Sequence, residues 1–200
     1  MVKRFGSTMH FIILLLLLAA CSEQPATPAG TATGRHAIPF NIVATGDSRT
    51  DIVAATSFAW MPGMQEAHED PHLGDLQMQA LLRESITVAM ADKGYLPAMD
   101  EGQSDLLVGY VLVLNDARAD QALAEQYGLK ASVNLASPDP TRYEKGTLVI
   151  DVIERSSGLS AWRSALQGFA SLDISESERR TRIHELVQRM LAGMPARLAN

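Results

Sequence analysis

Cysteine, basic charge and long apolar runs are all scarce in this sequence. Cys21 is the only cysteine, so no disulfide can form within one chain, and no thiol pair is available for redox chemistry. Acidic residues outnumber basic ones by 23 to 17, so the chain lacks the basic surface that nucleic acids and anionic lipid headgroups attract. No apolar run reaches the roughly 20 residues that a transmembrane helix needs. These absences exclude a disulfide scaffold, a nucleic-acid-binding protein and a helical membrane span.

The first 21 residues have the pattern of a secretory signal peptide. Lys3 and Arg4 precede the apolar run Phe11–Leu18, and two alanines then lead to Cys21. The letters "LAAC" resemble the bacterial lipobox, in which the peptide is cut before the cysteine and the thiol receives a diacylglycerol. We therefore predict a signal peptide over residues 1–20 and a lipid anchor on Cys21.

Lipidation determines the expected location and the first partner of the protein, which is the membrane. The lipobox resemblance implies sorting to the outer membrane, on its periplasmic side, because Ser22 and not an aspartate follows the cysteine. Loss of residues 1–20, which carry two basic and no acidic side chains, moves the formal charge from −6 to −8. An acidic chain is repelled by anionic headgroups, so we expect membrane contact through the acyl chains of Cys21 alone.

The mature chain divides into a tether and one domain. Residues 21–38 are rich in Pro, Ala, Thr and Gly and have no apolar period, so they cannot bury enough surface to offset the entropy of ordering. We predict a flexible tether there. Residues 39–200 have the length of one domain, and 46% of the whole sequence is hydrophobic, which is typical of a globular chain.

Two segments of the domain have helical periodicity. Residues 75–93 carry apolar side chains three or four positions apart, and Gly94 follows as a helix terminator. The second helix begins after Ser175, because Ser175 and Glu178 form the spacing of a capping box, and Gly193 and Pro195 end it.

Four segments have strand character. Residues 57–62, "SFAWMP", predict a short strand ending at Pro62, and residues 105–114 predict a central strand covered on both faces because they are almost wholly apolar. The segments 146–154 and 159–170 flank "RSSG", so they predict a β-hairpin in which Gly158 takes a positive φ. The connection 115–142 has no clear pattern apart from helical character around residues 119–127.

The order strand, helix, strand, hairpin, helix predicts the α+β class. We expect a two-layer sandwich with an antiparallel or mixed sheet of about four to five strands and two amphipathic helices packed on one face.

The order of several motifs resembles one bacterial lipoprotein family. The motifs are "FAW" at 58–60, "KGY" at 93–95, "SDLLVGY" at 104–110, "YEKGTLVIDVIE" at 143–154 and "AWRS" at 161–164. Together they are similar to domain of unknown function 4136, over roughly residues 53–196. Where members tend to have a glycine two places after the second tryptophan, this chain has Ser164. The resemblance implies the fold and an outer-membrane lipoprotein, and it brings no catalytic residues.

The stretch "HEDPH" matches the H-E-x-x-H pattern of zinc proteases, in which both histidines lie on one helix. Pro71 stands just before His72, and a proline inside a helix removes a donor and collides with the carbonyl of Ala67, at a cost of about 3 kcal/mol. Asp70 and Pro71 instead suit the start of a helix. We therefore expect His68 and His72 in an acidic loop at a helix entrance, with a metal site as the alternative.

The acids Asp151 and Glu154 do not predict a glycosidase pair. Three residues apart on a strand, they point to opposite faces. We expect Asp151 to point outward on the solvent face of the sheet, with a contact to a partner as the alternative.

Four residues are candidates for binding a partner. Trp162 with Arg163 beside it can anchor a partner if one face of the sheet is uncovered, while most aromatic residues are expected in the core. Arg179 and Arg182 belong to a basic set on the last helix, opposite in sign to the chain as a whole, and either lie on a solvated face or contact an acidic partner.

The sequence therefore predicts a non-catalytic lipoprotein domain, without a cofactor, that binds an unidentified protein or lipid of the envelope. The alternative is a metal-dependent hydrolase that uses the His68 and His72 loop.

Overall fold

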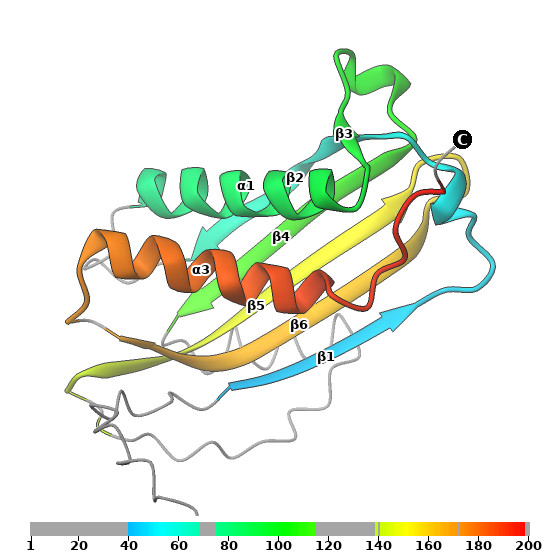
Figure 1. The fold of residues 1–200 in the computed structure, drawn as a ribbon. Coiled ribbons are helices and arrows are strands. Elements are labelled where there is room, and N and C mark those ends of the chain that lie inside the picture. The colour runs from blue at the N-terminus through cyan, green and yellow to red at the C-terminus, as the bar shows by residue number, and fades with distance from the viewer. Residues whose placement is uncertain (1–39, 69–74, 115–138, 140, 172, 199–200) are drawn as a thin grey trace, which may run out of the picture. The chain divides into compact units, whose positions relative to one another are not determined.

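The computed structural model describes residues 40–68, 75–114, 139, 141–171 and 173–198. Residues Ile38–Asn200 form one compact unit. Among the described residues of this unit, six strands make a single sheet and two α-helices lie across one face of that sheet (Figure 1). The chain is therefore a two-layer α+β sandwich, which confirms the predicted class.

The sheet is mixed, in the order β1-β6-β5-β4-β2-β3. The pairs β1–β6, β6–β5 and β5–β4 are antiparallel, while β4–β2 and β2–β3 are parallel. The strands are β1 (Phe40–Gly46), β2 (Ser57–His68), β3 (Leu96–Pro97), β4 (Leu106–Leu114), β5 (Tyr143–Glu154) and β6 (Leu159–Ser171). The hairpin β5–β6 was predicted correctly, and Gly158 in its turn has the expected positive φ, 70°.

The sheet has more strands than the four to five expected. β1 lies at one edge and was missed because Phe40–Gly46 is short and follows directly on the polar segment assigned to the tether. β3, at the other edge, has only two residues, which is too short to show a period.

The strand predicted over residues 57–62 continues to His68. Pairing with β4 shifts register between Trp60 and Gln65, and Gly63 there has a positive φ of 73°. Pro62 falls within this irregularity, where a missing backbone donor does not break the ladder. The expectation that the strand ends at the proline is therefore wrong.

Two α-helices cover the sheet. Helix α1 (Asp75–Asp92) ends one residue before the predicted boundary, and Gly94 after it has a φ of 90°. Helix α3 (Glu176–Leu191) has the predicted capping box, in which Ser175 accepts from the Glu178 amide and Glu178 accepts from the Ser175 amide. Two short 3-10 helices, Ile52–Ala54 and Glu101–Gln103, lie in connections.

Side-chain contacts join the two helices at corresponding positions along their lengths. Arg180 binds Glu84 at 2.6 Å, and Gln188 donates to Asp92 at 2.9 Å, so α1 and α3 run side by side in the same direction (Figure 1). Beneath them is the main core, whose fully buried members come from both layers: Leu82, Ile86, Met90, Leu106, Val108, Tyr110, Ile150, Val152, Val187, Met190 and Leu191.

The end of α1 is fastened to the segment after α3. Lys93 Nζ donates to the carbonyl of Met194 at 2.7 Å, and the buried Tyr95 hydroxyl donates to the carbonyl of Pro195 at 3.1 Å. Burial lowers the pKa of Lys93 and raises that of Tyr95. The "KGY" motif therefore joins the end of α1 to the segment that follows α3.

Candidate functional site

The residues of the "HEDPH" stretch are only partly described. His68 is the last residue of β2 and pairs with Val113 of β4, so the expectation that it lies in a loop is wrong. Asp70, Pro71 and His72 lie outside the described residues, as does Cys21. Within the part of the chain that is described, no three His, Cys, Asp or Glu side chains are grouped to hold a metal ion.

Trp162 and Arg163 do not form one surface. Trp162 lies in the main core, where its indole nitrogen donates to the carbonyl of Met190 at 3.3 Å. A Cβ on Gly193 would lie 2.9 Å from Cη2 of this ring, so the glycine allows the tryptophan to fit beneath the end of α3. Arg163, one residue along the strand, points to the opposite face of the sheet.

Arg163 binds the buried carboxylate of Asp151. Arg163 donates to Asp151 Oδ2 from Nε at 3.0 Å and from Nη2 at 2.5 Å, and the Ser160 hydroxyl donates to Oδ1 at 2.5 Å. Asp151 is only 2% exposed, so the expectation that it points outward into solvent is wrong. A buried carboxylate requires such pairing because loss of hydration is otherwise uncompensated.

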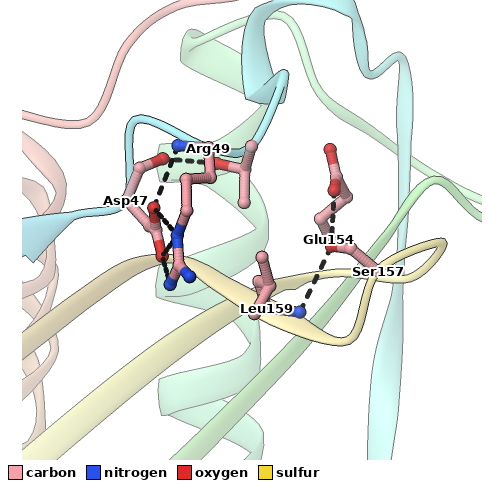
Figure 2. Close-up of polar contacts among 6 residues, drawn as sticks. Asp47, Arg49, Glu154, Ser157 and Leu159 are labelled. Carbon is pink, nitrogen blue, oxygen red and sulfur yellow. Dashed lines mark hydrogen bonds and ion pairs between the residues drawn. The ribbon is translucent and has the colours of Figure 1, made fainter.

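At the hairpin end of the sheet, the charged groups are engaged in local turns (Figure 2). Arg49 binds the carboxylate of Asp47 through its side chain and its amide, which lowers the pKa of Asp47 to about 2. The Ser157 hydroxyl donates to Glu154, and this bond lowers the pKa of Glu154. These groups shape turns, and Glu154 lies in a different network from Asp151.

A cleft opens at the other end of the sandwich, between the N-terminal halves of both helices and the sheet. We call it the end cleft; its volume is about 80 Å³. Its walls are mostly aliphatic, with Phe169 as the one aromatic residue among the described lining residues, and come from both helices and three strands: Leu82, Leu112, Leu148, Leu166, Ile183 and Leu186.

Two glycines form the floor of the end cleft. Gly146 of β5 and Gly168 of β6 pair in register and alternate with the core residues Leu148 and Leu166, so they face the helices. A Cβ on Gly146 would collide with Leu114 and lie 3.1 Å from the carbonyl oxygen of Val113. The lack of a side chain at Gly146 therefore allows Leu114 to pack directly over the strand.

Two arginines lie at the margin of the end cleft. Arg179 and Arg182 are three residues apart on α3, so they lie on the same helix face. Arg182 Nη2 donates to the carbonyl of Phe169 at 3.0 Å, and partial burial lowers the pKa of its guanidinium. Ser171 is the one other polar side chain among the described lining residues. Of the predicted binding residues, the structure thus brings together Arg179 and Arg182.

A second hollow, of about 170 Å³, lies between the two helices, and Arg179 lines it too. Its other charged groups are already matched, because Arg180 binds Glu84 at 2.6 Å and approaches Glu176 at 3.7 Å. The end cleft therefore combines apolar walls with positive charge, whereas the second hollow is polar and its charges are paired.

Sequence reasoning found the two arginines but not the cleft beside them. The apolar residues that line the cleft have the same spacing along the sequence as residues of the packed core. The sequence alone therefore does not show which leucines line a cleft. The one usable signal was Gly146, which interrupts an otherwise bulky strand.

A two-layer α+β sandwich with two parallel helices on one face of a mixed sheet defines the class of this protein. The chain belongs to the family described as "Domain of unknown function (DUF4136)", whose model matches residues 42–196. No curated protein matches the sequence.

Three of the solved structures to which this chain is similar are bacterial proteins. The PelC dodecamer from Paraburkholderia phytofirmans is 8% identical, with 80% of this chain and 100% of that chain covered and a TM-score of 0.48. A DUF4136 family protein from Bacteroides thetaiotaomicron is 14% identical, with 76% and 94% covered and a TM-score of 0.49. A PDZ domain protein from Parabacteroides distasonis is 14% identical, with 81% and 36% covered and a TM-score of 0.46.

No helix in the described ranges, which leave out residues 1–39, is long and apolar enough to cross a membrane.

Proposed function

We propose that this protein is a lipoprotein anchored to the outer membrane through Cys21, and that its periplasmic domain binds an envelope component at the end cleft without catalysing a reaction. The signal-peptide pattern and the "LAAC" sequence support the anchor. The end cleft carries the binding proposal, since a concave apolar site with a few polar groups at its margin is the usual form of a ligand pocket.

The residues of the family motifs make contacts that stabilise the fold, so they are not candidates for a binding surface. "KGY" joins α1 to the segment after α3, and Trp60 of "FAW" packs edge-on against Tyr110 at 6.1 Å, with Arg83 over its ring. Asp105 of "SDLLVGY" binds Thr56 and Ser57. Since these residues stabilise the fold, the end cleft is the better candidate for the binding site.

The test is photocrosslinking in intact cell envelopes. A photoreactive amino acid replaces Ser171, which lines the end cleft, and in a matched chain it replaces Arg49, which is exposed at the hairpin end. We expect a specific adduct, to protein or to lipid, from position 171 and none from position 49. Equal labelling from both positions, or none from either, contradicts binding at the end cleft.

A further inference from the structure

The walls of the end cleft have a composition that suits hydrocarbon. Its apolar lining is mostly leucine and isoleucine, with Met78 and Phe169, and Ser171 is the one uncharged polar side chain among the described lining residues. A hollow lined this way gives water too few hydrogen-bond partners to be well held. Alkyl groups that leave water for it are favoured by the hydrophobic effect.

The size of the end cleft limits what enters it. An apolar protein cavity of about 150 Å³ accepts one benzene molecule. The end cleft has about 80 Å³, so an aromatic ring is too large for it, while a single narrow alkyl chain can insert its end. Peptide recognition also relies on backbone hydrogen bonds, and these walls offer few donors or acceptors.

The two arginines at the margin of the end cleft favour a ligand with a negative charge. Arg182 is held in place by its bond to the carbonyl of Phe169. Arg179, three residues earlier on the same helix face, makes no side-chain hydrogen bond or ion pair with any residue in the described part of the chain. Two guanidinium groups beside an apolar hollow are complementary to an anionic head on an aliphatic tail.

We propose that the end cleft binds a single-chain fatty acid, with the end of its hydrocarbon chain among Leu82, Leu148 and Ile183 and its carboxylate at Arg179 and Arg182. The inference rests on the proposed function and names its ligand class. A volume of about 80 Å³ takes the end of one chain, so a two-chain phospholipid fits less well than a fatty acid.

The test is calorimetric titration of the compact unit, residues 38–200, with dodecanoate below its micelle concentration. We expect saturable binding that strengthens from butanoate to hexanoate and then levels off up to dodecanoate, because about 80 Å³ holds only about three methylene groups, each about the size of a water molecule. Dodecyl maltoside, which has the tail without the charge, should bind at least tenfold more weakly, and acetate, which has the charge without the tail, should not bind.

Three variants locate the binding site. Arg179→Glu should weaken dodecanoate binding at least tenfold, and Arg180→Glu, the same charge change on a residue that does not line the end cleft, should leave it within about twofold. Ala170→Leu, which fills the cleft, should abolish binding. Circular dichroism checks the fold of each variant, and Arg179→Glu changes a half-exposed helix position, so the test stands even if Ala170→Leu does not fold.

The outcomes separate this inference from the proposed function. Equal binding of dodecanoate by Arg179→Glu and Arg180→Glu, or equal binding of dodecyl maltoside, overturns the fatty-acid inference. If dodecanoate does not bind while the photoreactive group at position 171 still captures a specific envelope protein, the proposed function stands and its ligand is a polypeptide instead. Loss of both results overturns both proposals.

Discussion

At the scale of single residues, the ion pair of Asp151 and Arg163 is the clearest test of what stabilises the far face of the sheet. Arg163→Ala leaves the carboxylate of Asp151 buried with Ser160 as its remaining side-chain donor. We expect the free energy of unfolding to fall by about 3 kcal/mol, measured by urea denaturation.

The double variant Asp151→Val, Arg163→Leu supplies the control for this prediction. It removes both charges, so no uncompensated carboxylate remains, and we expect it to be more stable than Arg163→Ala alone. Equal loss in both variants would show that packing of the arginine stem, and not the ion pair, stabilises this site.

Ser164 is a residue whose hydroxyl works against stability. It is 0% exposed, faces the main core between Ala44 and Ile150, and its Oγ has no hydrogen-bond partner among the described residues. We expect Ser164→Ala to raise the free energy of unfolding by about 1 kcal/mol, since a buried unpaired hydroxyl is removed. Ser160→Ala, on the same strand, is the matched control and should lower it, because the Ser160 hydroxyl binds Asp151.

At the scale of elements, Asp105 joins the starts of two neighbouring strands. Its Oδ2 accepts from the amides and hydroxyls of Thr56 and Ser57 at 2.8 to 3.1 Å. The Thr56 amide is the largest cause that lowers the pKa of Asp105 below its ordinary value of 3.8. The carboxylate thereby aligns β2 with β4 in a parallel pair that no turn connects.

Acid should weaken this junction in a defined direction. Because the folded-state pKa is depressed, the stabilisation is fully present above about pH 4 and is lost as the pH falls through the lower folded-state pKa. We expect Asp105→Asn to cost about 1 kcal/mol at neutral pH and progressively less on acidification, followed by thermal unfolding at several pH values. A cost that is independent of pH would assign the effect to packing.

Elements with strong local signals were predictable, and those set by distant contacts were not. The capping box of Ser175 and Glu178 marked the start of α3, and the apolar run 106–114 marked the buried central strand β4. β1 was missed because its pairing with β6 depends on residues more than 100 positions away. Asp151 was misjudged for the same reason. The alternation of side chains along the strand indicates on which face of the sheet Asp151 lies, but its burial beside Arg163 depends on the tertiary fold.

The end cleft shows the same limit. Arg179 and Arg182 could be chosen from sequence because basic residues cluster on one helix of an acidic chain. The end cleft beside them could not, since its lining residues come from two helices and three strands that meet only in the folded sandwich. The sequence of one helix shows which charges lie on it, but a cleft forms only where the helices pack on the sheet.

At the scale of the whole molecule, the proposed attachment to the membrane depends on one atom, the Sγ of Cys21. We expect Cys21→Ser to abolish incorporation of labelled palmitate and to release the protein from membranes, because the acyl chains are the expected source of membrane affinity for an acidic chain. Ser22→Asp keeps the cysteine, so it should retain both the label and membrane association but shift the protein from the outer to the inner membrane fraction. The two substitutions therefore separate anchoring from sorting. Tight membrane association of an unlabelled Cys21→Ser protein would show that another part of the chain holds it there.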